Sequence, residues 1–169
     1  DALTASAPVA LVTRWQAVLD QASGLFADLA DGSRMGLVSR SAFGVIRGRH
    51  IAGVAAAPAT AADRSMLVFE ARRGTIGVDR VAFAGFAQAG VDLLFVVEDA
   101  ALGRLEALPT PEVLGAMKLA LRTGEAMFYV FRTKHELQDR GYEDFVGKLR
   151  GIGADIERIR LNRAGRFAL

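Results

Sequence analysis

Apolar side chains recur at three- and four-residue spacing near the start of the chain, over residues 8–29. This period places them along one face of a helix, so the pattern predicts an amphipathic helix. Gly32 follows the last of these positions and is a typical C-terminal stop. The predicted apolar face comprises Val12, Trp15, Val18, Leu19, Ala22, Leu25, Phe26 and Leu29.

The next apolar runs are short and are separated by turn residues. Residues 34–57 mix β-branched side chains with glycine-bearing turns such as "RGRH", which predicts two or three strands. A loop of small residues follows. The run "MLVFEAR" at residues 66–72 then predicts another strand, and "RRG" ends it. After it, Asp79 can cap a helix that continues to about Ala89.

Two strongly apolar runs lie in the second half of the chain. "VDLLFVVED" at residues 91–99 has the unbroken apolar centre of a strand that is covered on both faces. A loop then leads to Thr110, where an N-cap residue, a proline and an acid predict a helix that stops at Gly124. "MFYVFR" at residues 127–132 predicts a second buried strand. We expect these two strands at the centre of the sheet.

The stretch "GYEDFVGKLRGIGADIERIRL", residues 141–161, predicts a helix, a glycine stop and a short strand. A phosphate cradle needs its glycines at a helix N-terminus, where free N–H groups point at the anion. Here the glycines fall at the helix end, so we interpret the stretch as scaffold. Residues 139–159 resemble the C-terminal segment of UDP-N-acetylglucosamine enolpyruvyl transferases. The resemblance implies a local helix–glycine–strand shape and no activity.

The order of these elements predicts the fold class. An N-terminal helix, then strands, then alternating strands and helices indicate an α/β or α+β domain with a mixed sheet flanked by helices. We expect a single domain over residues 1–169. Because the chain begins with Asp1 rather than a methionine, we also expect that a preceding segment has been removed.

Composition narrows the classes of protein and site. Hydrophobic residues make up 51% of the chain, enough for a substantial core, yet no run reaches the roughly 18 apolar residues of a membrane span. The sequence has no cysteine, which a reducing cytoplasm would permit, and its two histidines lack the spacing of metal ligands. We therefore expect a cytoplasmic protein with no membrane contact, no metal site and no cofactor.

A first candidate site is "FEARRG". A strand that carries Glu70 and then Arg72, after a helix and two strands, resembles the core of PD-(D/E)xK nucleases, with Arg72 in place of the lysine. The resemblance implies a catalytic role for Glu70 and Arg72 in metal-dependent cleavage of nucleic acid. Residues 34–57 contain no acid that could act as the partner carboxylate, and a surface ion pair is the alternative interpretation.

Two further groups of charged residues are candidates. Glu98 and Asp99 follow the most apolar strand, at the carboxyl end where ligands of open α/β sheets gather, so they could bind Mg²⁺ or act as acid and base. The alternative is an ordinary exit from the core into a loop. Basic residues crowd the C-terminus and could bind nucleic acid or phosphate, or form a solvated strand face. They are Arg158, Arg160, Arg163 and Arg166.

Three functions remain open from the sequence. The leading hypothesis is a non-catalytic interaction module that assembles with itself or with a protein partner, because no complete catalytic motif or cofactor loop is present. The second is nucleic-acid binding or cleavage, although the net charge of +2 is small for that role. The third is a small-molecule enzyme that uses the acids at the strand end. Whether the chain is an enzyme stays undecided at this point.

Overall fold

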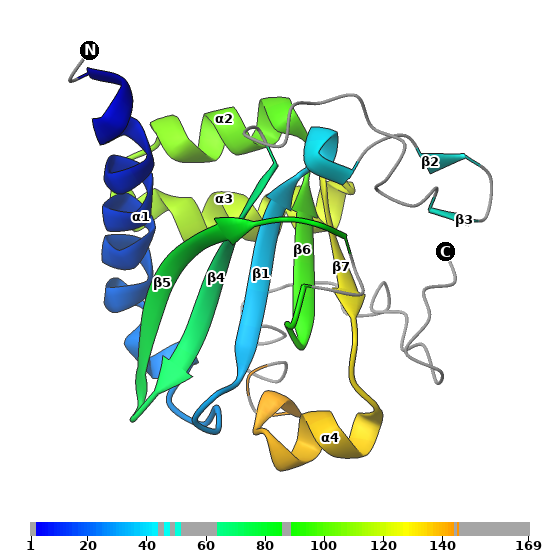
Figure 1. Ribbon diagram of the computed structural model, residues 1–169. Coiled ribbons are helices and arrows are strands. Elements are labelled where there is room, and N and C mark those ends of the chain that lie inside the picture. Colours follow the sequence, from blue (N-terminus) through cyan, green and yellow to red (C-terminus); the bar gives the residue numbers. More distant parts are fainter. Residues whose placement is uncertain are drawn as a thin grey trace.

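The structure is a computed structural model that describes residues 3–43, 46–47, 50–51, 64–85, 89–143 and 145. Within these residues, helices pack against a five-stranded sheet (Figure 1). The helices are α1 (Leu3–Gln21), α2 (Asp99–Ala107), α3 (Thr110–Thr123) and α4 (Lys134–Asp139), with 3-10 turns η1 (Ser23–Leu25) and η2 (Arg40–Phe43). The strands are β1 (Arg34–Ser39), β2 (Ile46–Arg47), β3 (His50–Ile51), β4 (Ser65–Arg72), β5 (Thr75–Ala82), β6 (Leu93–Val97) and β7 (Ala126–Val130).

The main sheet is mixed, with the strand order β5-β4-β1-β6-β7. β1 lies at its centre and runs parallel to β6 and antiparallel to β4. The outer pairs β4–β5 and β6–β7 are antiparallel, and β2 and β3 form a separate two-stranded sheet. The mixed sheet with flanking helices confirms the predicted α/β fold class.

Several predicted elements are confirmed. The described residues of the range 34–57 form three strands, and the predicted strand at residues 66–72 is β4. All five residues of β6 are buried, as its apolar pattern predicts for a strand covered on both faces. Gly124 ends α3 in the left-handed conformation, with φ of 83°. The predicted helix and strand after residue 145 lie outside the described residues.

The first helix ends earlier than predicted. α1 stops at Gln21, and a 3-10 turn and bends replace the predicted helix up to residue 29. Ser23 and Gly24 explain the difference, because serine competes for backbone hydrogen bonds and glycine disfavours helix interiors. Phe26 and Leu29 still reach the core, so the apolar pattern identified buried positions while the backbone changed conformation.

The predicted helix that starts at Asp79 is wrong. Residues 79–82 belong to β5, in which Asp79 lies opposite Val68 of β4. A tight turn at Arg73 and Gly74, both with positive φ, joins β4 directly to β5 and sets this register. The side chains of Ile76 and Val78 then alternate into the core.

Two other predictions are also corrected. "MFYVFR" contributes β7, which is an edge strand and not a central one in the sheet that the described residues form. The predicted loop after β6 contains α2, which starts at Asp99. Among the described strands, β6 has a neighbour on each side and β7 has one neighbour. Strand order depends on long-range pairing that apolar content does not encode.

The core has two parts, one on each face of the main sheet. On one face, residues of α1, α2 and α3 pack against β1, β4, β6 and β7 around Trp15, Phe69 and Phe95. Figure 1 shows these three helices on the same side of the sheet. On the other face, Ala42 and residues between β5 and β6, including Phe83 and Val91, cover Val38 and Leu94. No helix of the described residues is long and apolar enough to cross a membrane.

Candidate functional site

The first predicted pair, Glu70 and Arg72, is an ion pair on β4. Arg72 donates a hydrogen bond of 2.9 Å to Glu70, and Arg34 of β1 lies 4.0 Å from the same carboxylate. The hydrogen bond from Arg72 is the main reason that the pKa of Glu70 lies below its usual value. The Arg72 guanidinium is also 3.8 Å from Asp79 on β5. Both charges of the candidate pair therefore compensate each other on the sheet surface.

The second pair, Glu98 and Asp99, begins helix α2. Glu98 occupies the N-cap position and Asp99 is the first helical residue, where a negative charge interacts favourably with the helix dipole. The Asp99 carboxylate accepts a hydrogen bond of 3.0 Å from the backbone N–H of Ser41. Both acids are exposed. They lie at the carboxyl end of β6, as predicted. Asp99 acts locally at the start of the helix, whereas the Glu98 side chain makes no capping hydrogen bond.

The two predicted acidic sites are not brought together. Glu70 lies opposite Arg34, the first residue of β1, whereas Asp99 bonds to Ser41 just beyond the last. A strand of this length separates the two sites by roughly 15–20 Å. No group of three or more His, Cys, Asp or Glu residues that could hold a metal ion occurs in the described residues. Arg158, Arg160, Arg163 and Arg166 lie outside them.

Sequence reasoning missed a buried carboxylate, Asp92, just before β6. Its side chain is 1% exposed and accepts a hydrogen bond of 2.7 Å from Arg132 and one of 2.9 Å from Tyr142. Arg140 lies 3.1 Å away, and the backbone N–H of Arg34 donates at 3.0 Å. The Asp92 hydrogen bond raises the pKa of Arg132, and burial raises the pKa of Tyr142.

The signal for this cluster was present in the sequence. Asp92 stands between Val91 and Leu93, inside an otherwise apolar run, where a carboxylate needs a partner. Arg132 follows the apolar residues of the strand that pairs with β6. Because every oxygen of Asp92 has a protein donor, the arrangement joins elements of the fold and leaves no acceptor free for a ligand.

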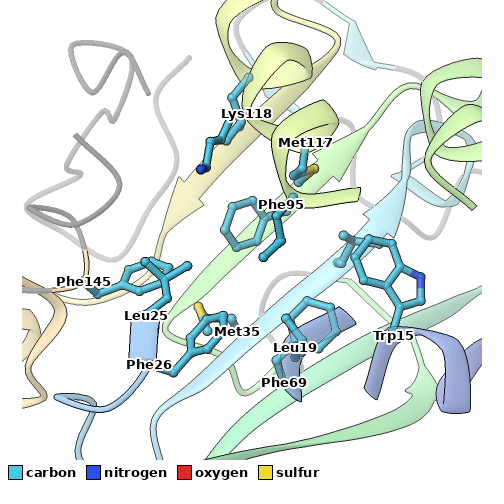
Figure 2. Close-up of a pocket in the computed structure, with 13 residues that line it drawn as sticks. Trp15, Leu19, Leu25, Phe26, Met35, Phe69, Phe95, Met117, Lys118 and Phe145 are labelled. Carbon is cyan, nitrogen blue, oxygen red and sulfur yellow. The ribbon is translucent and has the colours of Figure 1, made fainter. Parts of the chain in front are cut away.

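A small cavity lies between the helices and the sheet (Figure 2). Its volume is about 60 Å³. Lys118 of α3 is the one charged side chain among the described lining residues, and burial of its ammonium group lowers the pKa of Lys118. The other lining residues are apolar or aromatic: Trp15, Leu19, Leu25, Phe26, Met35, Leu37, Phe69, Phe95, Leu114, Met117, Leu121 and Phe145.

The two edges of the sheet differ in their protection. At the β5 edge, Gln16 of α1 donates a hydrogen bond of 2.6 Å to the carbonyl of Ile76 and accepts one of 2.9 Å from the N–H of Val78. The side-chain amide thus gives hydrogen-bond partners to two backbone groups that point outward from the sheet. The charged residues Asp79 and Arg80 also lie on this strand, and charges on an edge discourage pairing with another chain.

The β7 edge has neither kind of protection in the described residues. Its sequence, Ala126–Val130, contains no charged residue and no proline. Phe131 donates to the carbonyl of Asp92, and Glu98 donates to that of Glu125. By the alternation of an antiparallel ladder, the backbone groups of Ala126, Phe128 and Val130 therefore point away from β6. No strand of the described residues pairs with this side.

Comparisons with protein-family models, with curated proteins and with solved structures find no match to this chain.

Proposed function

We propose that this protein is a non-catalytic assembly module in which two copies join through their β7 edges. The observation that carries the proposal is the difference between the two edges of one sheet. At the β5 edge, Gln16 bonds the outward carbonyl of Ile76 and the outward N–H of Val78. At the β7 edge, no strand of the described residues pairs with the outward backbone groups, which lie beside apolar side chains. Such an edge is a template for another strand.

A second copy is complementary to this edge. In an antiparallel pair around a two-fold axis, Phe128 would face Phe128, and Ala126 would face Val130. The outward donors and acceptors of one strand then meet those of the other. No like charges oppose each other, because β7 has no charged residue. Met127, which is 40% exposed, would lie opposite Tyr129 of the second copy and lose part of its exposed surface.

The arrangement of the acids supports a non-catalytic role. Glu70 is held by Arg72, Asp99 accepts a backbone hydrogen bond at the start of α2, and Asp92 is enclosed by its donors. Each carboxylate has a structural partner, and the predicted pairs lie at different ends of β1.

A proline substitution tests the proposal. The N–H of Phe128 points away from β6, so Phe128→Pro removes an outward donor and keeps the ladder within the chain. Phe128→Val is the matched control, because it also loses the ring contact with Phe95, 4.5 Å between centroids, but retains the N–H. Light scattering after size exclusion should show a dimer for the wild type and for Phe128→Val, and a monomer for Phe128→Pro.

The opposite edge gives a second control. The N–H of Arg80 points outward from β5, so Arg80→Pro should leave the dimer intact. A wild-type protein that remains a monomer up to high concentration would refute the proposal. A Phe128→Pro variant that still forms the wild-type dimer would refute the assignment to β7.

A further inference from the structure

The cavity of Figure 2 lies on the helical side of the sheet, and none of its described lining residues belongs to β7. We propose that it is a binding site for short-chain aliphatic carboxylic acids. The alkyl tail would enter between the aromatic and methionine side chains, and the carboxylate would remain beside Lys118.

The walls specify an apolar tail. Phe26, Phe69, Phe95 and Phe145 contribute rings, and the described lining residues contain no hydroxyl, amide or carboxylate side chain. A polar tail would lose its hydrogen bonds to water without replacement. Met35 and Met117 also line the space, and methionine side chains adapt readily to an irregular ligand.

Lys118 specifies the charge of the head group. The side chain extends toward the cavity in Figure 2. Burial alone accounts for its lowered pKa, and no carboxylate of the described residues contributes to it. The buried ammonium group has lost part of its interaction with water. An anion at this position would replace part of that interaction, whereas a cation would be repelled.

The volume specifies a short tail. An apolar cavity of about 150 Å³ holds benzene, so about 60 Å³ accommodates roughly two to four carbon atoms. Butanoate matches this size. Acetate has too little apolar surface to gain from burial, and octanoate exceeds the space.

The four methionines provide a reporter for each region of the fold. Met35 and Met117 line the cavity, Met66 is buried on the other face of the sheet, and Met127 is exposed on β7. With methyl-labelled methionine, titration of the full chain with sodium butanoate should shift the Met35 and Met117 signals and leave those of Met66 and Met127. Butan-1-ol should bind roughly tenfold more weakly, because it cannot form a charge-assisted hydrogen bond.

Two lysine variants complete the test. Lys118→Met keeps an unbranched side chain, one atom shorter, and removes the charge, so it should weaken butanoate binding roughly tenfold and leave butan-1-ol binding unchanged. Lys134→Met removes the same charge from the exposed α4 and should have no effect. Lys118→Gln replaces Lys118→Met if the latter does not fold.

Three outcomes would overturn the proposal. These are equal binding of butanoate and butan-1-ol to the wild type, equal losses in the two lysine variants, and affinity that rises steadily from acetate to octanoate. The last would indicate adsorption to apolar surface. None of these readouts depends on the oligomeric state, so this proposal and the assembly proposal can fail separately.

Discussion

At the scale of single residues, two glycines show what the backbone demands of this sequence. Gly141 and Gly74 have nearly the same backbone conformation, with φ of 79° and 78°. A Cβ atom on Gly141 would lie 1.8 Å from the carbonyl oxygen of Asp28, whereas one on Gly74 would meet nothing within 4 Å. The turn after α4 packs directly against the backbone near Asp28, and the N–H of Ala30 donates a hydrogen bond to the backbone carbonyl of Arg140.

Because of this contrast, the two glycines should differ in how much an alanine substitution lowers stability. Gly141→Ala should lower the free energy of unfolding by about 2–4 kcal/mol, because the backbone must move to relieve the overlap in addition to the positive-φ strain. Gly74→Ala introduces only the strain of positive φ and should lower the free energy of unfolding by about 1 kcal/mol. Urea denaturation of both variants measures the difference. Equal losses of unfolding free energy in the two variants would contradict a close contact between Gly141 and Asp28.

The sequence identified some glycine roles and could not identify others. Gly124 was predicted as a helix stop because such stops depend only on neighbouring residues. The contact of Gly141 with Asp28 joins positions far apart in the chain, and no local pattern encodes it. For Gly141, this contact agrees with the interpretation of residues 141–161 as scaffold. The residues after 145 lie outside the described part of the chain.

At the scale of elements, the junction of α1 and α2 combines two opposite effects. Arg14 of α1 donates to the carbonyls of Leu105 and Leu108 at the end of α2, where backbone acceptors lack helical partners. Glu106 lies in the same last turn of α2, where a negative charge is unfavourable. Burial raises the pKa of Glu106 above its usual value of 4.5, although Arg14 and Trp15 oppose the effect.

A pH-dependent prediction follows for Glu106. A carboxyl with a raised pKa in the folded state stabilises the fold below 4.5, and this contribution is lost as pH rises through the folded pKa. Glu106→Gln should therefore raise the melting temperature at neutral pH, and the gain should vanish well below 4.5, where the wild-type carboxyl is protonated in both states. Glu112→Gln, at the start of α3, should give no gain. A gain for Glu106→Gln that does not change with pH would contradict the argument.

Elements were predictable where local signals agreed. β6 and α3 have consistent apolar patterns and end signals, and both were predicted. Asp79 carried the signal of a helix cap, yet the turn at Arg73 and Gly74 brings the chain back onto β4 and places it in a strand. In the same way, Asp99 begins α2 where the sequence predicts a loop, and Glu98 before it occupies the N-cap position.

At the scale of the whole molecule, the strand order was beyond local reasoning. The parallel pairing of β1 with β6 joins residues far apart in sequence, and it places β6 between β1 and β7. The candidate sites share this limit. Glu70 and Asp99 were identified by residue type, while their separation along β1 and the gathering of donors around Asp92 depend on the complete fold.

Asp92 allows a test of how the parts of the molecule hold together. It receives hydrogen bonds from β1 through the backbone of Arg34, from the end of β7 through Arg132, and from the region of α4 through Arg140 and Tyr142. Asp92→Asn keeps the shape but leaves two guanidinium groups without their counter-charge. Since these arginines are each 35% exposed, we expect a loss near 3 kcal/mol, the lower end for breaking a buried pair.

Asp99→Asn is the matched control for Asp92→Asn. The exposed Asp99 accepts one backbone hydrogen bond that an asparagine can also accept, so its replacement should cost only a few tenths of a kcal/mol. Arg132→Met should cost less than Asp92→Asn, because Asp92 then retains Arg140, Tyr142 and the N–H of Arg34 as donors. Chemical denaturation of the three variants ranks the losses. If Asp92→Asn is as mild as Asp99→Asn, the buried carboxylate does not join these elements, and the packing of the core alone must hold β1, β6 and β7 together.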